Sequence, residues 1–185
     1  LDHCIITNSF IGVQMEAFSE YTGNKTIISN SIIKNNQNSG VLARWADFEM
    51  TNTVVTNSGK CCLQLEVGNW EINNCTLANY AALGRDTTAP VVFVSNKNTY
   101  DNSTYNSSAT FTNTIIYGSL NRELWQVKVG SYNLNTSYQN CLIKTYEVLP
   151  AFQNCLRNLD PRFEDQTELD FRLKSTSPAI NAGFQ

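Results

Sequence analysis

The sequence predicts an all-β fold, a parallel solenoid of three sheets with roughly 22 residues in each coil. Three observations predict it: one strand pattern recurs along the chain, its Asn residues fall at a fixed phase, and the steps between copies share a base period. The pattern is an apolar strand, an anchor Asn, a small residue and an apolar pair. Its copies lie at 26–35, 48–57, 70–79, 109–118 and 136–145, with a partial copy at 1–8.

The spacing of the anchors indicates stacked coils. The anchors stand at positions 3, 30, 52, 74, 113 and 140, so the steps are 27, 22, 22, 39 and 27 residues. A base period of about 22 with insertions is typical of repeats that carry loops. Two alternatives fit less well, because disorder requires no fixed phase and an Asn-rich β-sandwich predicts no common period.

Each phase of the pattern has its own residue type and therefore its own place in a coil. Large apolar residues stand two positions before and three positions after the anchor, and the residue directly after it is always small. Stacking each phase on itself gives continuous interior rows, which is how coils this short bury a core. The anchor, which is His3 in the first copy, is expected in a tight left-handed turn, where its amide can bond the amide of the next coil. A second amide row is expected at Asn8, Asn35, Asn57 and Asn79.

Apolar segments between the copies fit a third strand in each coil. They lie at 13–16, 41–44, 63–66, 91–94 and, less clearly, 125–129. Three strands per coil predict three parallel sheets, with the coils covering residues 1–145. This pattern resembles the right-handed parallel β-helix superfamily, the pectin-lyase-like proteins, which includes pectate lyases and many bacterial surface proteins.

The end of the chain adds a second resemblance. Residues 159–183, LDPRFEDQTELDFRLKSTSPAINAG, are similar to the DPxFxD…DFRLxxxSPAIDAG ending of secreted bacterial β-helix proteins, with Asn181 where the pattern usually has Asp. The resemblance implies a bacterial protein that is secreted, periplasmic or on the cell surface. It also implies a terminal cap over 146–185 that protects the unpaired edge of the last coil. Because Leu1 already belongs to a strand, we expect a part of a longer protein.

Composition limits the classes of partner. The chain has 185 residues and a formal net charge of −3, so it has no basic field for nucleic acid. It has no run of about 18 apolar residues, so we expect no membrane span. His3 is the single histidine and no spacing of Cys and His suits zinc, so neither a metal site nor a cofactor is expected.

The chain has six cysteines, and their spacing argues against disulfides for three of them. Cys4, Cys75 and Cys141 share one phase but lie three and two coils apart, about 14 and 10 Å at the spacing of strands in a sheet. A disulfide needs Cα atoms within about 7 Å, so these three are expected to be buried free thiols. Cys61 and Cys62 are adjacent and would strain a mutual bond, and the sequence gives no partner for Cys155.

The outward row of the third strand is the best candidate for a binding surface, and on it Glu16, Arg44 and Glu66 stack on successive coils. The loops after 13–16 and 91–94 are long and are expected to form two walls beside the short turn at Trp45. Aromatic rings next to amide and charged groups suit sugars, which have apolar faces and polar edges. The candidate ligand-binding residues are Gln14, Glu16, Tyr21, Arg44, Trp45, Gln64, Glu66, Tyr100 and Tyr105.

A purely structural role and a catalytic role for this row both stay open. The stacked charges can form a solvated ion ladder, which contributes about 0–1 kcal/mol per exposed pair. Catalysis is disfavoured: Glu16 and Glu66 would lie about 9–10 Å apart, near the upper limit for an inverting glycosidase, but Arg44 between them would keep both charged. A lyase could use Arg44, Arg85, Arg122 or Lys128, but no Asp cluster resembles a calcium site.

The sequence therefore predicts a β-helix region that binds complex carbohydrate, a polysaccharide or surface glycan, without catalysis. A polysaccharide lyase or glycoside hydrolase with part of its site upstream is one alternative. A structural stalk or adhesin is the other.

Overall fold

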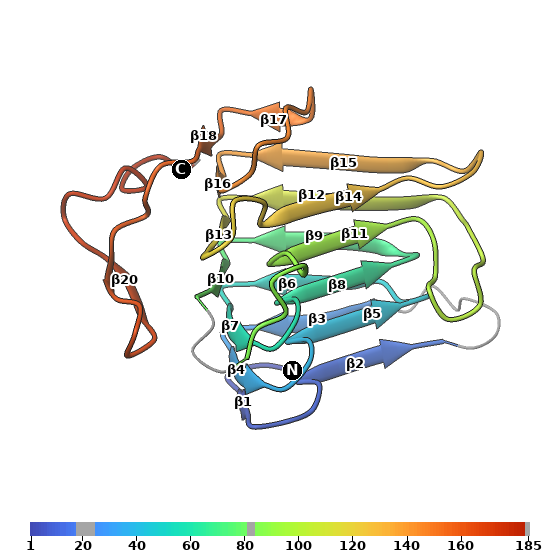
Figure 1. Ribbon diagram of the computed structural model, residues 1–185, viewed down its shortest axis with the longest axis horizontal. Coiled ribbons are helices and arrows are strands. Elements are labelled where there is room, and N and C mark those ends of the chain that lie inside the picture. The colour runs from blue at the N-terminus through green and yellow to red at the C-terminus, as the bar shows by residue number, and fades with distance from the viewer. Residues whose placement is uncertain (18–24, 81–83, 184–185) are drawn as a thin grey trace.

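The computed structural model describes residues 1–17, 25–80 and 84–183. Within these residues every regular element is a β-strand, and three long parallel sheets stack into a solenoid (Figure 1). The predicted all-β parallel solenoid is therefore confirmed.

The three sheets are numbered by the order in which the chain first enters them. Sheet 1 contains, in spatial order, β1 (Ile5–Thr7), β4 (Ile32–Asn36), β7 (Val54–Ser58), β10 (Thr76–Asn79), β13 (Ile115–Gly118), β16 (Leu142–Ile143) and β18 (Leu156–Arg157). Sheet 2 contains β2 (Val13–Glu16), β5 (Val41–Arg44), β8 (Leu63–Glu66), β11 (Val92–Ser95) and β14 (Leu124–Val127). Sheet 3 contains β3 (Thr26–Ser29), β6 (Phe48–Thr51), β9 (Asn69–Asn73), β12 (Ser107–Thr112), β15 (Leu134–Gln139) and β17 (Phe152–Gln153).

The register of the sheets follows the phase of the sequence pattern. Ile33, Val55 and Leu77 each stand three residues after an anchor, and they lie opposite one another on successive strands of sheet 1. Sheet 2 is made of the predicted third strands. The coil is therefore one sequence period, and residues one period apart become neighbours in space.

The turn from sheet 3 to sheet 1 has the same backbone shape in every coil. The anchors share a positive φ between 49° and 52°, as left-handed turns require, and they are His3, Asn30, Asn52, Asn74, Asn113, Asn140 and Asn154. The side-chain amide of Asn52 donates to Asn30 Oδ1 at 2.8 Å, so the expected amide ladder forms there.

The second amide row is shorter than predicted. The amide of Asn57 donates to Asn35 Oδ1 at 2.7 Å, as expected. Asn79 departs from this row, because its amide donates instead to the backbone carbonyls of Ser58 and Lys60 at 2.8 and 3.1 Å. The second ladder prediction was therefore wrong at Asn79, where the chain begins a long insertion.

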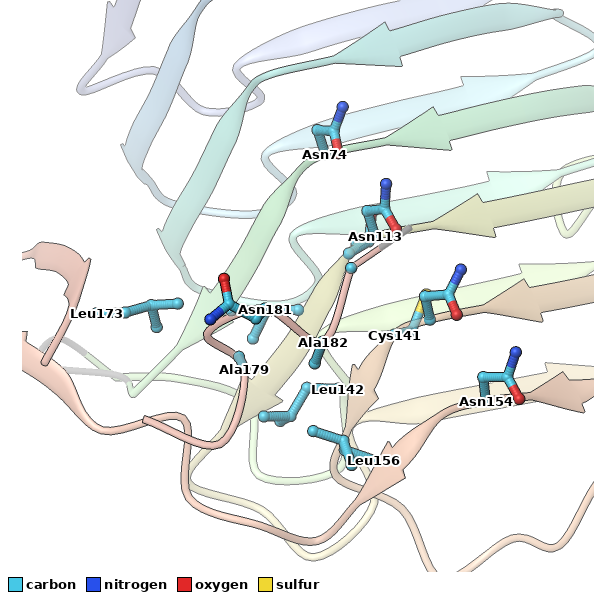
Figure 2. Close-up of a pocket in the computed structure, with 14 residues that line it drawn as sticks. Asn74, Asn113, Cys141, Leu142, Asn154, Leu156, Leu173, Ala179, Asn181 and Ala182 are labelled. Carbon is cyan, nitrogen blue, oxygen red and sulfur yellow. The ribbon is translucent and has the colours of Figure 1, made fainter. Parts of the chain in front are cut away.

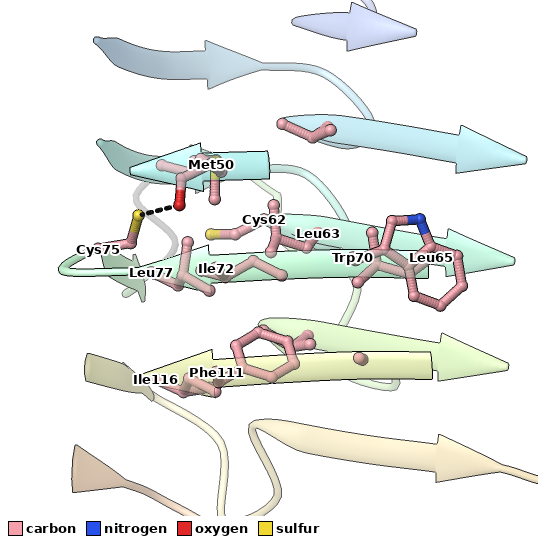
Figure 3. Close-up of a cluster of buried hydrophobic side chains, with 14 of the residues drawn as sticks. Met50, Cys62, Leu63, Leu65, Trp70, Ile72, Cys75, Leu77, Phe111 and Ile116 are labelled. Carbon is pink, nitrogen blue, oxygen red and sulfur yellow. Dashed lines mark hydrogen bonds between the residues drawn. The ribbon is translucent and has the colours of Figure 1, made fainter. Parts of the chain in front are cut away.

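The core consists of the interior rows that the pattern predicts. The row two residues before the anchors is fully buried at Ile28, Met50, Ile72, Phe111 and Tyr138. Figure 3 shows part of this core, in which the buried thiol of Cys75 donates to the carbonyl of Met50 at 3.6 Å. The small thiol fills the turn and also contacts the carbonyl of Asn73, at 3.2 Å.

Parallel pairing continues beyond the predicted coil boundary at residue 145. Strand β17 pairs with β15, and β18 pairs with β16, around the anchor Asn154. This rung has no strand in sheet 2, since residues 144–151 connect β16 directly to β17. The segment predicted as a cap thus begins with one more, shortened rung of the solenoid.

The rest of the terminal segment lies along the side of the solenoid, next to sheet 1 (Figure 1). Strands β19 (Phe163–Asp165) and β20 (Asp170–Leu173) form an antiparallel hairpin. Phe163 is 6% exposed and meets Tyr80, the residue directly after β10, edge to face, with 6.3 Å between the ring centroids. Residues 179–183 lie beside the anchor turns and leave a cleft of about 330 Å³ (Figure 2). Protection of the terminal edge by this segment stays a prediction.

Candidate functional site

The outward row of sheet 2 contains the predicted stack of charges. Parallel pairing places Glu16 opposite Arg44 and Arg44 opposite Glu66. Arg44 donates from Nη1 to Glu16 Oε1 at 2.7 Å and from Nε to Glu66 Oε2 at 2.9 Å. Burial disfavours the charge of Arg44, but Glu66 and Glu16 outweigh this effect and raise the pKa of Arg44. The three side chains therefore form one ion-paired unit across three rungs.

Glu66 lies under the surface and fastens a loop to it. Its side chain is fully buried. Beside Arg44, it accepts hydrogen bonds from Gln64 Nε2 at 2.7 Å, from the Thr99 backbone N–H at 2.9 Å and from the Thr99 hydroxyl at 2.8 Å. Thr99 belongs to the loop 96–106, which follows β11. We predicted Glu66 as a ligand-binding residue. In the structure its buried carboxylate holds the loop 96–106 in place through Thr99.

Above this row, the structure brings several predicted residues together in one groove. Gln14 and Gln64 contribute amides from the same outward row, Arg44 contributes its guanidinium, and Tyr100 covers them from the loop 96–106. The lining residues of this sheet 2 groove, of about 410 Å³, are Phe10, Ile11, Gln14, Glu16, Asn38, Leu42, Arg44, Lys60, Gln64 and Tyr100. Tyr100 and Phe10 are 75% and 63% exposed, so the groove presents two aromatic rings to solvent beside the polar side chains of Gln14, Arg44 and Gln64.

A smaller cavity continues the groove toward the end of β2. It measures about 110 Å³ and lies between Glu16, Arg44 and the loop residues Asn98, Tyr100 and Asp101. The loop 96–106 is therefore one wall of the groove, as predicted. The other predicted wall, with Tyr21, lies outside the described residues.

A second group of aromatic rings lies at the turns from sheet 2 to sheet 3. Trp45 contacts Tyr105 with 4.2 Å between ring centroids, and Tyr105 stacks on Tyr132 at 5.6 Å. Tyr105 and Tyr132 are each 43% exposed. We call Trp45, Tyr105 and Tyr132 the aromatic row. The sequence reasoning missed Tyr132, although its loop follows a sheet 2 strand just as those of Trp45 and Tyr105 do.

Trp45 adopts a backbone conformation that is costly for a bulky residue. Its φ is 54°, and Val67 at the equivalent position of the next rung has a φ of 59°. The turn therefore requires left-handed geometry, which Gly or Asn adopts with little strain and which other residues adopt at a cost of roughly 1–2 kcal/mol. A Trp held there at this cost is a candidate for function.

The outward row of sheet 2 becomes aromatic in its later strands. Phe93 lies opposite Gln64 and Trp125 opposite Phe93, and the two rings meet edge to face at 5.7 Å. The guanidinium of Arg122 lies 4.1 Å from the centroid of the Trp125 ring. The sequence reasoning did not include Phe93 and Trp125, although extending the phase of Gln14, Leu42 and Gln64 would have found them.

The arrangement favours binding over acid–base chemistry at this surface. Both carboxylates that could have formed a catalytic pair bond the same guanidinium, which occupies the space between them. Amides, one guanidinium and several aromatic rings remain on one face. Among the residues that the structure describes, no group of three or more His, Cys, Asp and Glu could hold a metal ion, and no helix is long and apolar enough to cross a membrane.

Comparison with known proteins gives no match of significance to a family model, to a curated protein or to a solved structure.

Proposed function

We propose that this chain binds polysaccharide or surface glycan, without transforming it, through the sheet 2 groove and the aromatic row. The observation that carries the proposal is the gathering of exposed aromatic rings around amide side chains on one face of the solenoid. A sugar ring offers an apolar face that stacks on Tyr or Trp and hydroxyl groups that bond amides. Gln14 supplies such an amide, and Gln64 adds a second that Glu66 and Ser39 hold in place, with one N–H and one lone pair left for a ligand.

An elongated ligand fits this surface better than a single sugar. The outward row runs through five strands in spatial order, from β2 to β14. Polar groups lie at one end, at Gln14 and Gln64, and aromatic rings at the other, at Phe93 and Trp125. A ligand laid across the rungs can therefore contact both, and its affinity comes from several weak contacts.

We further infer that the chain belongs to a secreted, periplasmic or cell-surface bacterial β-helix protein of the right-handed, pectin-lyase-like type. The support is the terminal segment 159–183 with its DPRFED and SPAINAG motifs, together with the parallel coils. Binding to a glycan outside the cell is consistent with such a location.

Glycan-array binding tests the proposal, with Trp45→Asn as the decisive variant. Asn adopts the left-handed turn of Trp45 with little strain, so the variant should fold, yet it removes the Trp45 ring that contacts Tyr105 in the aromatic row. We expect at least tenfold weaker binding from this variant. The matched control is Ile27→Asn, which changes a 56% exposed side chain on sheet 3, away from the groove, and should bind as the unaltered chain does.

Equal binding by Trp45→Asn, or binding to no glycan at all, would overturn the proposal. The same glycans are assayed for new reducing ends and for unsaturated sugars. Release of either by the unaltered chain would replace the proposal with the enzyme alternative, a hydrolase or a lyase.

A further inference from the structure

The residues directly after the anchors form a row with one shared geometry. Each hydroxyl or thiol of this row points to the backbone carbonyl two residues before it. Ser31 donates to Ser29 O at 2.6 Å, Thr114 to Thr112 O at 2.8 Å and Cys141 to Gln139 O at 3.3 Å. The row consists of Cys4, Ser31, Thr53, Cys75, Thr114, Cys141 and Cys155. A cysteine in this row therefore takes the place of a serine or threonine.

Cys155 joins this row because the solenoid has a shortened last rung. Its thiol donates to Gln153 O at 3.4 Å, as the others do to their own carbonyls. The pairing of Gln139 with Gln153 and of Leu142 with Leu156 makes Cys155 the direct neighbour of Cys141. The sequence could not assign this neighbour, since the step from Asn140 to Asn154 is much shorter than the usual period.

The distance between these two cysteines suits a disulfide. Neighbouring rungs lie about 4.8 Å apart, within the roughly 4.4–6.8 Å that disulfides span between Cα atoms. The thiol of Cys155 also reaches back toward the preceding rung, with its sulfur 3.3 Å from Tyr138 O. By contrast, Cys4 lies next to Ser31, and Cys75 lies between Thr53 and Thr114, so a cross-rung disulfide is not available to them.

The pair also has unequal exposure and acidity. Cys141 is buried at the base of the cleft beside the terminal segment (Figure 2), and Cys155 is half-buried. Contact with the Cys141 thiol lowers the pKa of Cys155 below that of an ordinary cysteine. The same contact, together with burial, raises the pKa of Cys141. Cys155 is thus suited to attack and Cys141 to resolve, because Cys155 is the more accessible of the two and its lowered pKa favours the reactive thiolate.

We propose that Cys141 and Cys155 form a reversible disulfide that fastens the last rung, β17 and β18, to the solenoid. The oxidant is a low-molecular-weight disulfide. The Cys155 thiolate attacks one of its sulfurs, which forms a mixed disulfide and releases one small thiolate. The released small thiolate takes the proton of Cys141 and becomes a thiol. The Cys141 sulfur then attacks the Cys155 sulfur and releases the second thiolate, which takes up a proton from solvent. The two cysteines lose two electrons, and the small disulfide is reduced to two thiols.

The place of the bond gives it a structural consequence. The last rung pairs with one neighbouring rung only, and β17 and β18 are short strands, so this end of the stack opens readily. A covalent link to the preceding rung opposes that opening. The redox state therefore sets how firmly the terminal segment 159–183 is held.

Thiol mapping tests the proposal. The reduced, folded chain is incubated with oxidised glutathione, its remaining thiols are alkylated, and it is digested with trypsin, which cleaves after Lys144 and separates the two cysteines. We expect the mass of two hydrogens to be lost and one cross-linked peptide pair to contain Cys141 and Cys155. We also expect the oxidised chain to melt at a higher temperature than the reduced chain.

Two serine variants make the result specific. Cys155→Ser should fold, because Ser31 already occupies the same position, and it should lose both the cross-link and the change in melting temperature. Cys75→Ser, in the same row, should keep both. The proposal fails if Cys141 and Cys155 are both alkylated after oxidation, if the link joins other cysteines such as Cys61 and Cys62, or if Cys155→Ser melts like the oxidised chain.

Discussion

The turn from sheet 3 to sheet 1 and the turn from sheet 2 to sheet 3 differ in how much they vary. In the first, an anchor and one small residue separate β3 from β4, and the same is true between β6 and β7. In the second, residues 67–68 join β8 to β9, whereas residues 96–106 join β11 to β12. The first turn has the same length in these coils, and the amide of Asn52 bonds Asn30 across two of them, whereas the second turn carries loops of different length. The variable turn is therefore where function is expected.

The two turns share a backbone conformation but differ in the residue that adopts it. Asn52 and Trp45 have φ values of 49° and 54°. Asn suits this geometry, and its amide continues the ladder, so its role is structural. Trp does not suit it, and its ring lies against Tyr105 at the edge of the candidate surface. The same backbone conformation thus occurs at a position of structural role, Asn52, and at a proposed binding position, Trp45.

The largest effect is expected where the variable turn is anchored. Glu66→Ala leaves the Thr99 backbone N–H and part of the Arg44 guanidinium without their buried partner, so we expect a loss of about 3–5 kcal/mol in the free energy of unfolding. Denaturant unfolding measures it. Glu16→Ala removes one partly exposed contact of the same guanidinium and should cost clearly less. Equal losses would show that the loop 96–106 does not depend on Glu66.

The repeated turn should respond next most strongly. Asn52→Ala loses the amide bond to Asn30 and places Ala in a left-handed turn, so we expect a loss of about 2–3 kcal/mol and a lower melting temperature. Asn52→Gly keeps the backbone freedom and removes only the amide, so it should cost about 1 kcal/mol. If both variants melt like the unaltered chain, the amide ladder does not stabilise the stack.

A substitution at the equivalent left-handed position of the variable turn, Trp45, should change the stability of the chain much less. Trp45→Asn relieves left-handed strain of about 1–2 kcal/mol and loses a ring contact worth about 0.5–1.5 kcal/mol. Thermal melting should therefore change little, in contrast to Asn52→Ala. A loss as large as that of Asn52→Ala would make Trp45 a structural residue and remove the contrast between the turns.

The smallest effect is expected on the exposed face of sheet 3. Lys25 bonds Glu49 and also lies 2.9 Å from Glu71, and these contacts raise its pKa. Its contribution is present at neutral pH and is lost only as the pH rises through that raised value. Lys25→Met should cost no more than about 1 kcal/mol, and less at high salt. A larger loss in the free energy of unfolding, measured in urea, would mean that the contacts of Lys25 with Glu49 and Glu71 support the coil.

The parts of the fold that follow the period could be predicted, and the parts that break it could not. The phase of Asn30 and Asn52 predicted the left-handed turns, and the alternation in 41–44 and 63–66 predicted sheet 2. The shortened last rung at Asn154 was missed because it lacks a sheet 2 strand. The path of 159–183 along sheet 1 depends on the contact of Phe163 with Tyr80, which no repeat encodes.

The candidate site shows the same division. The stack of Glu16, Arg44 and Glu66 follows from register alone, since parallel strands bring equal phases together. The burial of Glu66 does not, because it depends on how the loop 96–106 folds back and places Thr99. Tyr132 was missed because its loop follows β14, and β14 does not carry on the stack of charges that drew attention to Glu16, Arg44 and Glu66.

Residue-resolved NMR tests the central claim, that the variable turn binds glycan and the repeated turn does not. The isotope-labelled chain is titrated with a panel of soluble neutral and acidic oligosaccharides. We predict that at least one of them shifts the signals of Gln14, Trp45 and Tyr105 and leaves those of Asn30, Asn52 and Asn74 in place. Shifts centred on the Asn ladder, or no shift with any member of the panel, would contradict the account.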